Sequence, residues 1–329
     1  MNATRTTLTA AVSAAVLLTG GAAYATATAT AAPSAKGATA YVTNYSSGTV
    51  TPIRTATNTV GTPITVGGGP DGIAITPDGK TAYVTNMGSG TVTPIRTATN
   101  TPGTPITVGS NPHGIAITPD GTTAYVTNYS SGTVSPIRTA TNTAGTPITV
   151  GNNPYGIAIT PDGTTAYVTN TGSSTVTPIL TATNTPGTPI TVGGNPYGIA
   201  ITPDGKTAYV TRDGSDTVTP IRTATKAIGT PITVGDGPLS IAITPGGKTA
   251  YVTNSGSGTV TPIRTATNTA GTPITVGDGP VGIAITPDGK TAYVANEHSG
   301  TVTPIRTATN TAGAPITAGT RTREIAITP

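Results

Sequence analysis

The sequence predicts an all-β fold, a seven-bladed β-propeller with four antiparallel strands per blade. The first observation is a repeat. The segment Ala40–Asn44 (AYVTN) returns every 42 residues, with its tyrosine at Tyr41, Tyr83, Tyr125, Tyr167, Tyr209, Tyr251 and Tyr293. The second observation is that each interval holds four short segments rich in Ile, Val, Thr and Tyr, which favour strands. Four strands in a repeat of this length are typical of one propeller blade.

The unit is clearest between residues 72 and 113. A first strand, GIAITP, is followed by the Asp-Gly hairpin turn of Pro77–Lys80, a signature of tightly connected antiparallel strands. The second strand is Thr81–Asn86, and a small polar loop leads to the third, Thr91–Thr97. The fourth strand is Thr104–Gly109. A loop of Gly, Asn and Pro then carries the chain to the next GIAITP.

The two ends of the repeat region complement each other. The first copy lacks a first strand, because the repeats open at a second strand, Thr39–Asn44. The chain ends on a lone first strand, Glu324–Pro329. We therefore expect residues 36–329 to form one ring, closed by the C-terminal strand pairing in blade 1. Closure removes the unpaired strand edges that otherwise invite aggregation.

The strand patterns predict which side chains face the neighbouring blades. GIAITP is expected innermost, where the small Ala74 suits the narrow end of each blade. Tyr83 and Val84 are consecutive, so they lie on opposite faces of the second strand and each blade face has an apolar group to bury. Pro94 stands inside the third strand, where proline is uncommon, so we expect a bulge or a position without a ladder hydrogen bond there.

Composition restricts the chemistry. The chain has 35% hydrophobic and 9% charged residues, no Cys, and a net charge of +4. The absence of cysteine excludes disulfides and thiolate metal sites. So small a charge over this length is weak support for a polyanionic partner such as nucleic acid.

The N-terminal region predicts export. Residues 1–25 resemble a secretory signal peptide, with Arg5, a short apolar segment at Leu8–Leu18, and an Ala-x-Ala site at Ala23–Ala25. Cleavage after Ala29 is an alternative, and so is a retained membrane anchor, although the apolar segment is shorter than the roughly 20 residues of a spanning helix. Residues 26–35 are expected to be a disordered Ala/Thr linker. The mature protein is then secreted, with no membrane span.

With AYVTN, GIAITPDGK and TATNT at this period, the sequence resembles the YVTN-repeat β-propeller family over residues 36–329, and more distantly WD40 propellers. The resemblance implies a secreted or surface-layer protein with a binding or scaffold role. One departure is an arginine in a third-strand position that is usually acidic, with leucine once: Arg54, Arg96, Arg138, Leu180, Arg222, Arg264 and Arg306. Seven-bladed relatives include sugar-lactone hydrolases and a streptogramin lyase, but none of their catalytic patterns can be placed on this chain.

Because the copies are so alike, the positions that differ between them indicate where a site would lie. One variable position precedes the innermost strand: Asp71, His113, Tyr155, Tyr197, Leu239, Val281 and Arg323. The loop after the second strand is also variable: Tyr45, Met87, Tyr129, Thr171, Arg212 with Asp213 and Asp216, Ser255, and Glu297 with His298. Antiparallel strand order puts both loops at the same end of every blade, around the channel mouth.

We therefore predict a ligand-binding site there, with His113, Tyr155 and Tyr197 forming an aromatic arc and Asp71 and Arg323 beside it. Tyr129 and Arg212, on the second loop, complete the candidate set. Aromatic faces with a few polar groups suit sugars and other small polar molecules. The alternative interpretation is unconstrained variation of surface loops.

Other site types have less support. The chain has two histidines, His113 and His298, and no serine in a recognisable nucleophile turn, so no catalytic residue is assigned. Glu297 and His298 are adjacent and would point apart on a strand, and the Asp-Gly pairs are turn formers, so neither a metal nor a cofactor is expected. We interpret the repeated third-strand arginines as solvated ends of their strands. The alternative is that they form a ring that binds anionic wall polymers.

The sequence thus predicts a secreted, monomeric binding or scaffold module for an extracellular glycan, wall polymer or protein. A lactonase- or lyase-like enzyme with its site at the channel mouth is one alternative, and a structural surface protein without a small ligand is another. Association with the cell wall is compatible with the binding or scaffold module and with the structural surface protein.

Overall fold

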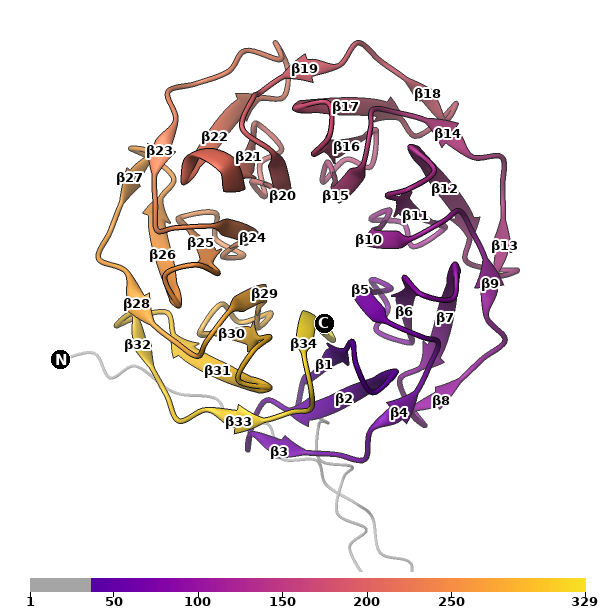
Figure 1. Ribbon diagram of the computed structural model, residues 1–329, viewed down its shortest axis with the longest axis vertical. Coiled ribbons are helices and arrows are strands. Elements are labelled where there is room, and N and C mark those ends of the chain that lie inside the picture. The colour runs from indigo at the N-terminus through magenta and orange to yellow at the C-terminus, as the bar shows by residue number, and fades with distance from the viewer. Residues whose placement is uncertain (1–36) are drawn as a thin grey trace, which may run out of the picture. The chain divides into compact units, whose positions relative to one another are not determined.

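A computed structural model describes residues 37–329, which form a ring of seven blades around a central channel (Figure 1). The innermost strands are β5 (Pro70–Ile75), β10 (Pro112–Ile117), β15 (Pro154–Ile159), β20 (Pro196–Ile201), β24 (Pro238–Ile243), β29 (Pro280–Ile285) and β34 (Thr322–Ile327). The second strands are β1 (Thr39–Asn44), β6 (Thr81–Asn86), β11 (Thr123–Asn128), β16 (Thr165–Asn170), β21 (Thr207–Arg212), β25 (Thr249–Asn254) and β30 (Thr291–Asn296).

The third strands are β2 (Thr49–Arg54), β7 (Thr91–Arg96), β12 (Thr133–Arg138), β17 (Thr175–Leu180), β22 (Thr217–Arg222), β26 (Thr259–Arg264) and β31 (Thr301–Arg306). The outermost strand of most blades is interrupted and appears as two short pieces: β3 (Thr59–Val60) and β4 (Ile64–Thr65), β8 (Thr101–Pro102) and β9 (Ile106–Thr107), β13 (Thr143–Ala144) and β14 (Ile148–Thr149), β18 (Thr185–Pro186) and β19 (Ile190–Thr191), β27 (Thr269–Ala270) and β28 (Ile274–Thr275), and β32 (Thr311–Ala312) and β33 (Ile316–Thr317). Blade 5 has β23 (Ile232–Thr233) alone, and the short 3₁₀ turn η1 (Asp213–Ser215) follows β21.

The proline of the third strand faces this interruption. The carbonyl of Pro94 accepts a hydrogen bond from the amide of Gly103, between β8 and β9. In an antiparallel strand the N and O of one residue point to the same side, so the nitrogen of Pro94 also faces the gap in the outer strand. This confirms the expectation that Pro94 occupies a position without a ladder hydrogen bond. Its missing amide hydrogen therefore costs the sheet no bond.

The ring closes as the sequence predicts. β34 pairs antiparallel with β1, with Ala40 opposite Ile327 and Val42 opposite Ile325. In Figure 1 the last, yellow strand lies beside the first, indigo one and completes blade 1. β1 and β34, the first and last strands of the described residues, are thereby held in one sheet, and β1 has an innermost partner like every other second strand.

The core is divided among the interfaces between blades. Tyr83 packs with Val92 against Val126 of blade 3, whereas Val84 packs against Tyr41 of blade 1, so both faces of β6 are buried as expected. The hydroxyl group of each repeated tyrosine reaches the turn after the third strand of the next blade. Tyr83 donates to Asn142 Oδ1 at 2.7 Å, and Tyr293 donates to Asn58 Oδ1 at 2.7 Å across the closure between blades 7 and 1.

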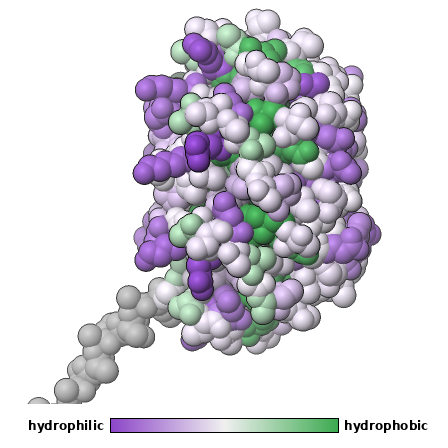
Figure 2. All heavy atoms as spheres, turned by 90° about the vertical axis from the view of Figure 1, so that its left-hand side faces the viewer, coloured by the Kyte–Doolittle hydropathy of each residue, from purple (hydrophilic) through white to green (hydrophobic). Residues whose placement is uncertain are grey.

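The two ends of the blades differ in chemistry. At one end the Asp-Gly turns are rigid: Asp78 Oδ1 accepts from Thr76 Oγ1 at 2.6 Å and from the Lys80 amide at 3.0 Å, which confirms their role as turn formers. The repeated arginines are exposed where the third strands end. At the other end lie the variable loops. Viewed from the side, hydrophilic side chains gather toward the two flat faces of the ring, with hydrophobic ones between them (Figure 2).

The predicted signal peptide (1–25) and linker (26–35) lie outside the described residues. Among residues 37–329 no helix is long and apolar enough to cross a membrane.

Candidate ligand-binding site at the channel mouth

A cavity of about 120 Å³ opens at the end of the channel where the innermost strands begin. This is the end that carries the variable loops, as the strand order predicts: the Met87 amide donates to the Gly69 carbonyl, joining the loop after a second strand to the loop before a first strand. Three rows of residues line the cavity, namely the variable position, the glycine after it and the following isoleucine. The site is therefore built on the strands nearest the axis.

Five copies have glycine in the middle row, where the innermost strands approach one another closely. A Cβ atom on Gly72 would stand 2.2 Å from the His113 carbonyl oxygen, and one on Gly156 would stand 2.5 Å from that of Tyr197. Only two copies place a side chain in this row, Ser240 and Glu324.

A threonine of the second strand fixes the backbone that carries each variable residue. The hydroxyl group of Thr85 accepts from the Gly72 amide at 2.8 Å and donates to the His113 carbonyl at 2.7 Å, thus linking blade 2 to blade 3. The same arrangement holds in six of the seven blades, and Ala295 replaces the threonine in blade 7. The side chains at the mouth thus project from a rigid, hydrogen-bonded ring.

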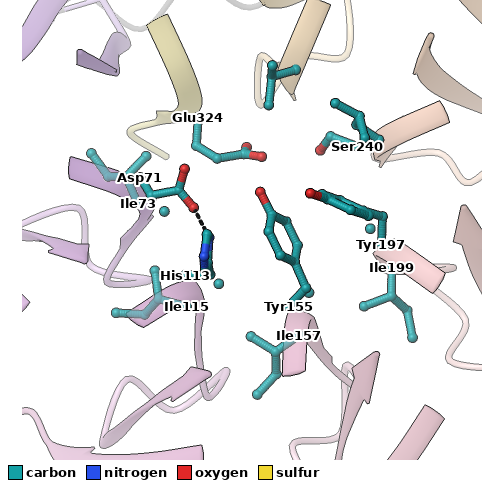
Figure 3. Close-up of a pocket in the computed structure, with 16 residues that line it drawn as sticks. Asp71, Ile73, His113, Ile115, Tyr155, Ile157, Tyr197, Ile199, Ser240 and Glu324 are labelled. Carbon is teal, nitrogen blue, oxygen red and sulfur yellow. Dashed lines mark hydrogen bonds and ion pairs between the residues drawn. The ribbon is translucent and has the colours of Figure 1, made fainter. Parts of the chain in front are cut away.

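Asp71 and His113 form the most buried polar pair of the site. His113 Nδ1 lies 2.6 Å from Asp71 Oδ2, and the side chains are 11% and 4% exposed (Figure 3). Since a carboxylate accepts, His113 donates through Nδ1, which leaves Nε2 for other contacts. Arg323 Nη1 lies 4.0 Å from Asp71 Oδ1. The structure thus brings Asp71 and Arg323 together as expected.

The predicted aromatic arc is continuous. The His113 and Tyr155 ring centroids are 4.5 Å apart, and those of Tyr155 and Tyr197 are 4.0 Å apart. Tyr129 meets His113 edge-on at 5.2 Å. Burial and the Asp71 carboxylate raise the pKa of the Tyr155 and Tyr197 hydroxyl groups, so both phenols are neutral hydrogen-bonding groups at ordinary pH.

Glu324 is the residue that our sequence analysis missed. Its carboxyl group points into the channel toward the hydroxyl groups of Tyr155 and Tyr197 (Figure 3). Burial, and then the neighbouring charge of Asp71, raise its pKa to about 8. The signal was present in the sequence, because Glu324 stands where five copies have glycine, but we compared copies only at the loop positions.

A second acidic group, Glu297, organises the seam between blades 7 and 1. Glu297 Oε1 accepts from Arg321 Nη2 at 2.7 Å and lies 3.1 Å from Arg323 Nη2. Both guanidinium groups lie 5.2 Å from the ring centroid of Tyr45. Arg323 is therefore held between Glu297 and Asp71.

Arg212 does not belong to this group. It ends β21 at the position where the other second strands have asparagine, and its Nη1 donates to Thr219 Oγ1 at 3.3 Å. The second strand lies one strand farther from the axis than the innermost strand, and Arg212 is not among the residues lining the cavity. The structure therefore does not bring Arg212 together with the aromatic arc, and a role of Arg212 in binding stays a prediction.

Within residues 37–329 no group of three or more His, Asp or Glu side chains is arranged to hold a metal ion. The carboxyl groups of Asp71 and Glu324, the His113 imidazole and the two phenols instead form a hydrogen-bonding site with apolar walls. Such a site can bind a small polar molecule and orient it, and its His113–Asp71 pair can accept a proton.

Comparisons with known proteins identify the fold. No family model and no curated protein matches the sequence, so the YVTN-repeat family is not established for this chain. Similar solved structures include the hydrazine synthase of Kuenenia stuttgartiensis, with 26% identity and a TM-score of 0.77 over 82% of this chain and 92% of that one. The periplasmic gluconolactonase PpgL of Pseudomonas aeruginosa has 17% identity and a TM-score of 0.75 over 89% and 99%.

A third structure, a putative 6-phosphogluconolactonase from Bacteroides fragilis, has 18% identity and a TM-score of 0.73 over 91% of this chain and 100% of that one. At these identities the two lactonase-like structures support the propeller fold alone. The chain is thus a seven-bladed β-propeller built from near-identical blades.

Proposed function

We propose that this propeller is a secreted binding module whose ligand, a small polar molecule or the end of a glycan or wall polymer, enters the channel mouth. One observation carries the proposal: the side chains that break the repeat converge from four neighbouring blades on one cavity. Asp71, His113, Tyr155 and Tyr197 are packed against one another there. Strand order alone brings these positions to one end, but unconstrained surface variation gives no reason for them to be buried and paired as Asp71 and His113 are.

The chemistry of the cavity suits a ligand with both apolar and hydrogen-bonding faces. Tyrosine supplies a ring face together with a hydroxyl group, and the isoleucine row supplies apolar walls. The carboxyl groups add acceptors that fix orientation.

The test is a binding screen by calorimetry against neutral sugars, sugar lactones, amines and soluble wall-polymer fragments. We expect at least one class to bind the wild type and to lose at least tenfold in affinity in the Tyr155→Ala/Tyr197→Ala double variant. Met87→Ala is the matched control, because Met87 lies on the same face but does not line the cavity. Binding that is unchanged in the double variant would place the site elsewhere.

Export is part of the proposal and has its own test. N-terminal sequencing of the protein recovered from culture medium or from a cell-wall fraction should begin after Ala25 or after Ala29. A mature chain that begins at Met1 and stays in the cell would contradict secretion. Size-exclusion chromatography with light scattering tests whether the protein is a monomer.

A second candidate, lactone hydrolysis, is favoured by the His113–Asp71 pair. With Nδ1 bound to Asp71 at 2.6 Å, Nε2 of His113 could take a proton from water as the water attacks a lactone carbonyl. The ring C–O bond then breaks, and the proton passes to the departing alkoxide. The phenols of Tyr155 and Tyr197 are placed to donate to the carbonyl oxygen.

Charge favours an unphosphorylated lactone as substrate. The cavity is lined by two carboxyl groups, and neither Lys nor Arg is among its lining residues. A phosphate group would therefore meet no unpaired cation. Turnover of gluconolactone by purified protein that disappears in His113→Ala would support this candidate, and no turnover above the buffer rate would exclude it.

A further inference from the structure

Glu324 is not part of the aromatic arc of His113, Tyr155 and Tyr197, yet it lines the same cavity. Among residues 37–329 its carboxyl group forms no ion pair or side-chain hydrogen bond. Its backbone is held by Thr43, whose Oγ1 accepts from the Glu324 amide at 2.9 Å and donates to the Glu324 carbonyl at 3.3 Å. Among these residues, the neighbouring Ile325 amide is the one donor that favours the charged carboxylate besides Arg323. A carboxylate that is largely withdrawn from water and has no ion-pair partner is unfavourable unless a cation meets it.

The neighbouring charges leave it unpaired. Arg321 and Arg323 both contact Glu297, and Arg323 also faces Asp71, whose other oxygen binds His113. Three carboxyl groups thus share two guanidinium groups and one imidazole that is already bound to Asp71.

The space beside Glu324 is fixed by the fold. Its Oε2 atom lies 2.7 Å from where a Cβ atom on Gly282 would stand, so the carboxyl group leans over a glycine of the neighbouring blade. Its free side faces the phenol oxygens of Tyr155 and Tyr197 in the cavity (Figure 3). Carboxylate and phenol oxygens are acceptors for an N–H group, and the aromatic rings attract a cation.

We propose that the ligand of the channel mouth carries a protonated amine, whose ammonium group contacts the Glu324 carboxylate and the hydroxyl oxygens of Tyr155 and Tyr197. This inference rests on the proposed binding function and names the ligand class. An ammonium group supplies the charge that the site lacks and donates up to three hydrogen bonds. A free alkylamine and an amino sugar share this chemistry.

The pH dependence follows from the charge pairing. Because burial favours the neutral form of Glu324, binding an ammonium group requires the carboxyl group to lose its proton. Below pH 8 the affinity for an alkylamine, which stays protonated up to about pH 10, should therefore rise by up to about tenfold per pH unit and then level off. A ligand that accepts a hydrogen bond from the neutral carboxyl group would show the opposite trend.

Isothermal titration calorimetry at pH 6, 7 and 8.5 tests the proposal with four probes: n-butylamine, n-butanol, glucosamine and N-acetylglucosamine. We expect n-butylamine to bind at least tenfold more tightly than n-butanol at pH 8.5. Glucosamine, whose amine loses its proton at lower pH than an alkylamine, should bind more tightly than N-acetylglucosamine at pH 7, and this sugar pair distinguishes an amino sugar from a free alkylamine. Proton release, read from titrations in two buffers of different ionisation enthalpy, should accompany binding at pH 7.

Two variants isolate the carboxyl group. Glu324→Gln keeps the shape, and Glu324→Gly restores the residue that most copies have, which protects the fold. Both should abolish the preference for amines and its pH dependence, whereas Asp236→Asn, an exposed carboxylate, should leave them unchanged. Neutral probes that bind as tightly as amines would overturn the ammonium inference while leaving the binding function in place. No binding by any probe here or in the wider screen would overturn both.

Discussion

The change Glu324→Gln should alter stability in a pH-dependent way. In the folded protein burial and Asp71 raise the pKa of Glu324 to about 8, against 4.5 for the free side chain. Between these values the folded protein retains a proton that the unfolded chain has lost. The free energy of unfolding of the wild type therefore falls, through this group, as pH rises from about 4.5 to about 8. Glutamine has no proton to lose and removes this decline.

The size of the effect follows from the same pKa values. At about 1.4 kcal/mol per pH unit, the interval from 4.5 to about 8 corresponds to about 5 kcal/mol. Glu324 is half-buried and borders the channel, so solvent stabilises part of its charge. We therefore expect the variant to gain about 2–4 kcal/mol relative to the wild type between pH 5 and pH 9.

Urea denaturation of both proteins at pH 5, 7 and 9 measures this difference. The exposed Asp236→Asn variant controls for the general effect of removing a negative charge. A stability difference between Glu324→Gln and the wild type that is the same at all three pH values would show instead that Glu324 ionises normally in the folded state.

Three further predictions concern the ring and the site. Tyr83→Phe removes the donor to Asn142 Oδ1, and a polar atom left without its partner should lower the free energy of unfolding by about 1–2 kcal/mol, read from urea denaturation; an unchanged midpoint would show that this interblade bond is dispensable. Deleting residues 322–329 exposes the edge of β1, and size-exclusion chromatography should show aggregation or loss of the compact monomer, whereas a monomer with unchanged melting temperature would contradict closure as a source of stability. Asp71→Asn removes the second cause of the raised pKa of Glu324, so the titration of the Glu324 carboxyl carbon, followed by NMR, should move to lower pH; an unmoved titration would mean that burial alone sets it.

The fold could be predicted from the sequence because each copy repeats the same strand pattern and the ends are complementary. Pairing of Glu324–Pro329 with Thr39–Asn44 needed no information beyond counting. The aromatic arc was also predictable, since antiparallel order brings the variable position of every blade to one end. The family, the export signal and the ligand stay predictions.

The remaining parts of the site depend on how far apart residues lie in space, and the 42-residue repeat alone does not give these distances. Glu324 was not predicted as a site residue because five copies have glycine at its position. There the glycine allows the innermost strands to approach one another closely. Arg212 lies outside the cavity because the second strand that it ends is one strand farther from the axis than the innermost strand, although both reach the same end of the blade. The ion pair between Glu297 and Arg323 joins residues of blades 7 and 1, and these two residues meet only when the ring closes.

The most direct test of the channel-mouth site is a crystal structure of the protein grown at pH 8.5 with the tightest-binding amine. We expect density for the ligand in the cavity, with its nitrogen within about 3 Å of a Glu324 carboxylate oxygen and beside the phenols of Tyr155 and Tyr197. An amine bound elsewhere on the propeller while the cavity holds only water would contradict it.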